Sequence, residues 1–294
     1  MRVAAILTTS RTSAAIALLA GPFTAAAVAA QAADKGEGVE FDVKTVMSAS
    51  GVMSSMLGSM VPGYSGHGFA IGRRVRIDIV EGAMPPLAEK GDYMLFDSTG
   101  ITIVRPSKKE FVVMPLDVGN KAMEQVQAMG MSIALGDISV KFDSLPGTDT
   151  IAGYATHHYK QTINYTLAIE AMGTAQQMKT QAATEYWVAT VPGLVTSPLQ
   201  QTSQMSGGSQ AVSTSAASGP FKDLAAKVDS VSHLLHGSAL RVQMTTTSEG
   251  AGADVGLNMT SEMSNLKRVS VAANLFVIPA DYTRGASPFP GGHH

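Results

Sequence analysis

The sequence predicts a mainly antiparallel β protein of the α+β class, and three observations support this. Apolar and polar residues alternate with a period of two in many short segments, as in half-buried strands. Turn residues separate these segments at short intervals, which is typical of an antiparallel meander. Only a few stretches show helical periodicity. The 294-residue chain is 45% hydrophobic, which is enough to build a large core.

The N-terminal segment is predicted to be a signal peptide. Arg2 and Arg11 are followed by small apolar residues, interrupted by a Gly-Pro pair, up to Asp34. A charged start, an apolar middle and Ala-x-Ala endings are typical of secretory signals. The apolar run is also shorter than the roughly 20 residues of a membrane span. We therefore expect cleavage of residues 1–32 and a periplasmic or secreted protein.

Strands are predicted through the first half of the remaining chain. Residues 39–47 alternate apolar and charged side chains, and a second alternation begins at Gly72. In this second strand Val75, Ile77 and Ile79 share one face, which therefore needs a buried partner. Three shorter strands, separated by turns, are expected at 92–97, 101–105 and 110–114.

Alternation returns in the second half. Residues 151–168 form a long run that is broken at Gly153, and we expect 184–190, which carries the only tryptophan, to pair with it. The remaining strands of this half are predicted at 138–142, 240–246, 255–261 and 268–278.

Three segments are candidates for helices. Pro220 opens the strongest one, in which apolar residues repeat at helical spacing until Gly237. Weaker candidates are 53–60, where methionines fall on one helical face, and 120–129. We expect the Pro220 helix to pack against the strand face of Ile77, with a cavity between them. The predicted lining consists of Met53, Met56, Met60, Val75, Ile77, Ile79, Phe221, Leu224 and Val228.

The domain organisation is predicted to be simple. Residues 39–284 form one domain, and 285–294 form a loose Pro- and Gly-rich tail. Within the domain, residues 197–219 are rich in Ser, Gln, Thr and Gly and contain almost no large apolar residue. Such a segment buries too little surface to offset its ordering entropy, so a flexible insertion is expected.

The composition excludes several classes of protein. Charged residues make up 15% of the chain and the formal net charge is −2. Without a basic stripe, no nucleic-acid partner is expected. The chain has no cysteine, and therefore no disulfide, no thiolate metal site and no residue that could carry a lipid anchor.

The sequence contains no catalytic motif. It lacks a Gly-x-Ser-x-Gly elbow, a His-Glu-x-x-His motif, a P-loop and a dinucleotide-binding Gly-x-Gly-x-x-Gly. Its carboxylates are scattered along predicted strands, as on any solvated β surface. We therefore expect no enzyme activity, no catalytic residue and no cofactor.

Methionine and histidine are the residue types that could bind a metal. The chain has 17 methionines, and Met-x-x-Met spacing can bind Cu(I) through soft thioethers. Methionine also fills irregular apolar space, and its spread along the chain favours core or cavity lining. His157 and His158 point to opposite faces of a strand, and His233 with His236 would be only two ligands. No metal site is predicted.

Arg73, Arg74 and Arg76 form a basic cluster at the start of the Gly72 strand. Such a cluster can hold a phosphate or carboxylate head group. It can equally form ion pairs with acids on neighbouring strands, which is the interpretation that we favour.

The order of these elements, together with several short motifs, resembles a known family. The motifs are Gly72-Arg73-Arg74-Val75-Arg76-Ile77-Asp78, Asp97-x-x-Gly100, Ile151-Ala152-Gly153-Tyr154 and Phe276-x-Ile278-Pro279-x-x-Tyr282. Over residues 39–284 the chain resembles the LolA/LolB superfamily of periplasmic lipoprotein carriers, most of all an uncharacterised sub-family. The resemblance implies an open half-barrel with two or three helices on its concave face and an apolar cavity between them.

The expected function is that of a periplasmic, non-enzymatic binding protein or carrier for a lipid-like or amphipathic ligand. Two departures from the carriers, the missing cysteine and the Ser/Gln-rich insertion, bear on lipoprotein transfer itself. One alternative is an envelope protein-interaction module that uses the same sheet without a ligand. Another is a periplasmic metal handler that uses methionine and histidine. Lipid extraction separates the first two functions, and copper titration tests the third.

Overall fold

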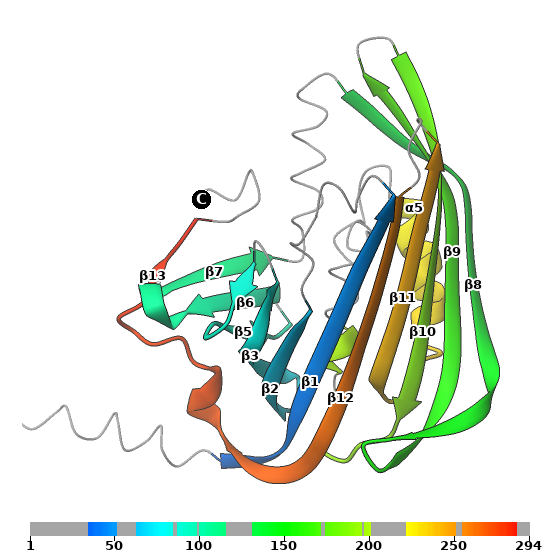
Figure 1. The fold of residues 1–294 in the computed structure, drawn as a ribbon. Helices are drawn as coiled ribbons and strands as arrows, with labels where there is room; N and C mark the ends of the chain where they lie inside the picture. Colours follow the sequence, from blue (N-terminus) through cyan, green and yellow to red (C-terminus); the bar gives the residue numbers. More distant parts are fainter. Residues whose placement is uncertain are drawn as a thin grey trace, which may run out of the picture.

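The computed structural model describes residues 35–51, 63–84, 87–98, 100–115, 131–171, 174–195, 197–200, 222–250 and 255–286. These residues form one open sheet of 13 strands, almost entirely antiparallel, with few helices (Figure 1). The predicted mainly antiparallel β class is confirmed. No helix in the described ranges is long and apolar enough to cross a membrane.

The sheet consists of two halves joined at its centre. The first half contains β1 (Lys35–Gly51), β2 (Tyr64–Ile71), β3 (Arg74–Met84), β4 (Ala88–Glu89), β5 (Tyr93–Phe96), β6 (Gly100–Arg105) and β7 (Glu110–Pro115). The second contains β8 (Met131–Ile151), β9 (Tyr154–Ala171), β10 (Thr174–Ala189), β11 (Ser238–Gly250) and β12 (Val255–Ala272). The strand order is β13-β7-β6-β5-β3-β2-β1-β12-β11-β10-β9-β8, with β13 (Thr283–Arg284) beside β7 and β4 beside β3.

One face of the sheet, here called the core face, carries the main hydrophobic core. Phe41, Ile77 and Met263 are 0% exposed and belong to the same buried cluster. On β1 and β3 buried and more exposed residues alternate, as the sequence predicts. The expected burial of Val75 and Ile79 on the same face as Ile77 is confirmed.

The strand β2 was not predicted from the sequence, because all its core-facing positions after Tyr64 are occupied by small residues, Gly66, Gly68 and Ala70. A side chain at Gly68 would overlap the ring of Phe41, and one at Gly66 would lie 2.6 Å from Ile77. Large side chains on β1 and β3 therefore fill the space above β2, and glycine is the residue that leaves room for them.

One end of the core face is closed by the segment after β10. Leu194 bridges to Gly72, and the Ser197 hydroxyl donates a hydrogen bond to the Ala239 carbonyl at 2.6 Å. Leu199 is 0% exposed and lies in the main cluster. The first residues of the predicted insertion thus belong to the packed fold, whereas residues 201–219 lie outside the described residues.

The C-terminal strand prediction was partly wrong. β12 is continuous to Ala272, since it pairs with β1 along its whole length, and a 3₁₀ turn (Ala273–Phe276) follows where a strand was expected. Phe276 and Ile278 then pack with Tyr93 on the opposite face of β5, in a second small core. Both faces of β5 are therefore buried. The apolar end of the strand predicted at 268–278 packs in this second core.

The helix predicted after Pro220 is confirmed as α5 (Lys222–Ser232), but its expected partner was wrong. Leu224 is buried against Ile163 and Ala182, on the β8–β10 part of the sheet, with Val228 beside them. The Ile77 face instead packs within the main cluster. Periodicity shows that each face needs a partner, but it does not identify that partner. The predicted helices at 53–60 and 120–129 lie outside the described residues.

Candidate functional site

The strand register places defined residues of the core face side by side, so that they form rows across the strands. One row runs from Tyr64 through Thr45 and Ser261 to Val242. The next row consists of Met47, Met259 and Met244, on β1, β12 and β11. Met244 and Met259 are each 2% exposed, and Met47 is half-buried. We call these three residues the methionine row.

The structure brings only some of the predicted lining residues together. Val75, Ile77 and Ile79 share the main cluster, and Leu224 and Val228 share the cluster beneath α5. These are two separate sets. Met53, Met56, Met60 and Phe221 lie outside the described residues.

The methionine row was missed by the sequence reasoning. Each of its members lies within or next to a predicted strand, and each continues that strand's alternation of apolar residues. The available signal was the unusual methionine content of the chain. The grouping itself depends on the register among three strands that are distant in sequence, which periodicity does not contain.

Beyond the methionine row an apolar stripe continues onto a projecting arm. The arm is formed by the ends of β8, β9 and β10, which extend past the last β11 pair at Gly250 (Figure 1). Leu135, Leu167 and Met178 are cross-strand neighbours at the base of the arm, in the row of the last β11 pair. They are only half-buried, as are Ile133 and Ile169 in the next row. The arm therefore presents an apolar surface beyond the packed core.

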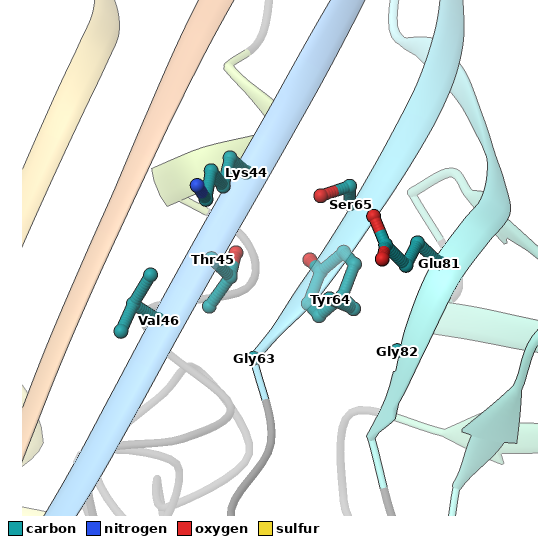
Figure 2. Close-up of a pocket in the computed structure, with 8 residues that line it drawn as sticks. All are labelled: Lys44, Thr45, Val46, Gly63, Tyr64, Ser65, Glu81 and Gly82. Carbon is teal, nitrogen blue, oxygen red and sulfur yellow. The ribbon is translucent and has the colours of Figure 1, made fainter.

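A pocket of about 330 Å³, here called the notch, lies beside the methionine row. Figure 2 shows its residues, which come from the facing parts of β1, β2 and β3. The lining consists of Lys44, Thr45, Val46, Gly63, Tyr64, Ser65, Glu81 and Gly82.

The notch exists because β2 is shorter than its neighbours. β2 begins at Tyr64, opposite Thr45, while β1 continues to Gly51 and β3 to Met84. A bulge at Val80 also shifts the pairing between β2 and β3. In the described residues the pairing of β2 with β1 and with β3 ends at Tyr64.

Two glycines allow the chains to approach one another here. A Cβ atom at Gly82 would overlap the Gly63 carbonyl oxygen, and one at Gly63 would overlap the Thr45 carbonyl oxygen. Gly82 also has a φ of +79°, a left-handed conformation that glycine adopts without strain.

Tyr64, which lines the notch, has a buried hydroxyl group. The Tyr64 residue is 3% exposed, and its hydroxyl has no hydrogen-bond partner among the described residues. Burial raises the pKa of this phenol, and the neighbouring Thr45 side chain only partly opposes the rise. The Thr45 hydroxyl is itself engaged with Ser261 at 2.8 Å. A buried hydroxyl without a partner costs free energy.

Opposite charges border the same pocket on the face away from the core. Lys44, Ser65 and Glu81 are cross-strand neighbours in one row. Lys44 and Glu81 are exposed, and neither has an ion-pair partner among the described residues. Val46, which lines the pocket, and Val80, next to Glu81, are 52% and 53% exposed. The outer rim of the notch therefore combines opposite charges with exposed apolar side chains.

In the other charged clusters the side chains contact one another or a neighbouring aromatic ring. The Trp187 ring stacks on His158 at 4.2 Å, and the Arg241 guanidinium lies 5.3 Å from its centre. Burial alone would raise the pKa of Glu185, but hydrogen bonds from Lys160 and His158 hold it below its usual value. Arg76, from the predicted basic cluster, is occupied by Asp78 on its own strand and by the Tyr93 ring.

No group of three or more His, Asp or Glu side chains in the described ranges is placed to hold a metal ion.

Comparison with known proteins identified no relative of this chain. No family model matches it, and no curated protein matches it.

Proposed function

We propose that the protein is a periplasmic, non-enzymatic carrier of a lipid-like or amphipathic ligand. The observation that carries the proposal is the methionine row, which lies on the core face of an open sheet beside the notch. In this proposal the sheet acts as a half-barrel related to the LolA/LolB carriers. Helix α5 covers part of its concave face, and the predicted segments 53–60 and 120–129 supply further cover.

The physical reason lies in the side chains of the row. Methionine is unbranched and polarizable, so it adapts to guests of different shape. An apolar surface that is shielded from water favours acyl chains over water.

Titration of a fluorescent fatty acid into the folded protein tests the proposal. Saturable uptake that is reversed by unlabelled lipid is expected. Met244→Gln should weaken uptake several-fold, because a near-isosteric amide replaces a thioether in the row. Gln243→Ala, on the same strand but facing away, is the matched control and should leave uptake unchanged. The absence of saturable uptake by the unaltered protein would overturn the carrier function.

The apolar arm favours a second candidate, an envelope protein-interaction module. Half-buried apolar residues on projecting strands, such as Leu167, are typical of surfaces that accept another protein. Under this alternative the folded protein takes up no probe. Under the carrier proposal the fatty-acid probe binds at the methionine row on the core face, so Leu167→Ser leaves its affinity unchanged.

Export is the remaining part of the proposal. Removal of residues 1–32 would place the mature chain in the periplasm, where such a carrier works. N-terminal sequencing of exported protein tests this, and a mature chain that still begins at Met1 and sediments with membranes would contradict it.

A further inference from the structure

We propose that the protein associates with a second copy of itself through strand β8. The two β8 strands would pair antiparallel about a two-fold axis at Phe142, so that the two sheets become one continuous sheet. The edge of β8 is thus an interface between identical chains. This association goes beyond the carrier function proposed above and does not depend on it.

Strand β8 forms one border of the sheet. It is 21 residues long and pairs with β9 along one of its edges, and both strands are described without a gap except for their outermost side chains. Within the described ranges no strand pairs with the other edge, and Figure 1 shows β8 as the outermost strand on that side. The backbone N–H and C=O groups of such an edge can form hydrogen bonds with a strand of another chain.

Two bulges delimit a regular stretch of β8, residues 139–145. The pairing with β9 is shifted directly before and directly after this stretch, and within it each residue has one partner. Each bulge contains a residue with a positive φ, Asp137 at +51° and Gly147 at +106°. Both lie five positions from Phe142, the central residue of the stretch. A pairing of two β8 strands centred on Phe142 therefore places bulge opposite bulge and the regular stretches side by side.

Two opposite charges in this stretch select the register. Lys141 and Asp143 lie on the face away from the core and form an exposed ion pair at 3.0 Å within their own strand. An antiparallel pairing centred on Phe142 places Lys141 of each copy opposite Asp143 of the other, which gives two attractive cross-strand pairs. If the pairing is centred on Lys141 or on Asp143 instead, like charges lie directly opposite one another and repel. The stretch is therefore self-complementary in one register.

The core face of β8 suits the same register. The methionine row continues from Met244 through Gln161 to Phe142, at the border of the sheet. The Phe142 ring is half-buried and stacks on Tyr159 at 5.5 Å. In the dimer the two Phe142 side chains would be cross-strand neighbours, and aromatic pairs at such positions stabilise a sheet. The methionine rows of the two copies would be aligned through this pair.

Helix α5 packs beside this edge without using its backbone. It rests on Ile163 and Ala182, which belong to β9 and β10. Its Lys227 donates a hydrogen bond to the Ile138 carbonyl oxygen at 2.6 Å, in the first bulge and outside 139–145. In the described part of the chain no side chain forms a hydrogen bond with the backbone of 139–145. The outer backbone groups of the stretch are therefore available to a second strand.

The size and the symmetry of the contact limit the assembly to a weak dimer. Bulges restrict the pairing of an edge strand, and here they leave seven residues of each copy in register. Such a contact is smaller than a standard protein interface, so we expect a Kd of about 10–100 µM. Because the contact is two-fold symmetric and uses the same edge of both copies, the assembly closes as a dimer.

Sedimentation velocity of the purified protein between about 5 and 500 µM tests the inference. The unaltered protein should show a concentration-dependent equilibrium between monomer and dimer. Lys141→Glu alone and Asp143→Lys alone should each weaken dimerisation about 5-fold or more, because both cross-strand pairs become repulsive. An equimolar mixture of these two variants should associate again, since each carries the charges that attract the other.

Lys108→Glu is the matched charge control. Lys108 is exposed in the 3₁₀ turn Pro106–Lys108, in the other half of the sheet, so this variant should dimerise like the unaltered protein. Thermal unfolding at low concentration should differ little among the variants, because the Lys141 side chain is 74% exposed.

Cross-linking tests the register, because the chain has no cysteine. Phe142→Cys gives one thiol per chain, and the two Cβ atoms would lie about 5 Å apart across the two-fold axis. A short bismaleimide should therefore link two copies efficiently. Thr150→Cys, on the same strand, is the control. Its two thiols would lie roughly 50 Å apart in the dimer, so that no link forms.

A protein that stays monomeric up to about 500 µM overturns the inference. A dimer that neither single charge variant weakens overturns it as well, and so does a mixture of the two variants that fails to associate. Equal cross-linking of Phe142→Cys and Thr150→Cys would place the contact outside the proposed register and would likewise overturn it. None of these results depends on lipid uptake, so the carrier function is tested separately.

Discussion

Replacing Gly82 by alanine tests the backbone geometry that creates the notch. Gly82 has a φ of +79°, which costs an alanine about 1–2 kcal/mol. The new Cβ would also overlap the Gly63 carbonyl oxygen and lie 3.0 Å from the Tyr64 Cα atom. Both are backbone atoms, so relief requires a shift of β2, which we expect to add about 1–3 kcal/mol.

The matched control is Gly91→Ala. Gly91 has a φ of +93°, but a Cβ there meets no atom within 4 Å, so this variant carries the conformational cost alone. In both variants alanine also restricts the unfolded chain, which returns about 0.4–1 kcal/mol. The net expectation is a loss of about 1–4.6 kcal/mol for Gly82→Ala and of about 0–1.6 kcal/mol for Gly91→Ala, the difference being the cost of the backbone shift.

Urea unfolding at neutral pH measures both losses, and calorimetry should show the same order. In a domain of this size each kcal/mol lowers the melting temperature by about 2–4 °C. Equal losses of stability in the two variants would refute the close approach of β2 and β3 at the notch.

Two further predictions concern folding and pH. Ile77→Asp should abolish cooperative folding or cost more than about 4 kcal/mol, because Ile77 is 0% exposed. Arg74→Ala, on the same strand, should cost at most about 1 kcal/mol, since the one contact of its guanidinium within the described residues is the Phe276 ring, at 5.2 Å. Circular dichroism melting compares the two variants, and similar losses would contradict the assigned faces. Hydrogen bonds from Asn265, and next from His67, hold the pKa of Asp42 below 3.8. The contribution of the Asp42 carboxylate to the free energy of unfolding is therefore complete above pH 3.8 and is lost as the pH falls through the lowered pKa. Asn265→Gly, which tolerates the positive φ of that position, should raise the Asp42 pKa in an NMR titration; an unchanged midpoint would show that Asn265 is not the main cause.

Much of the local structure could be predicted from the sequence. The period-two pattern identified β1, β3, most of β9 and the middle of β8 at 138–142. The Ala152-Gly153 loop between β8 and β9 has positive φ at both residues, as a tight type I′ turn requires. The helical period and Pro220 identified α5. Each of these signals lies within one short segment, because alternation and helical spacing record which face of an element avoids water.

The tertiary structure alone decided the partners of those faces. β2 has too many glycines for a strand signal and is held by Phe41 and Ile77 from its neighbours. α5 packs on Ile163 rather than on Ile77. Phe276 and Ile278, which were predicted to lie in the last strand, pack instead on the opposite face of β5.

The candidate site was likewise decided by the tertiary structure. The methionine row and the notch arise where β1 meets β12 and β2, and the Thr45–Ser261 hydrogen bond at their junction joins residues 216 positions apart. Register between such distant strands depends on the packing of the whole sheet. A periodic pattern specifies only that a face is to be buried, so the sequence determined which side chains point inward and the assembled sheet determined which of them meet.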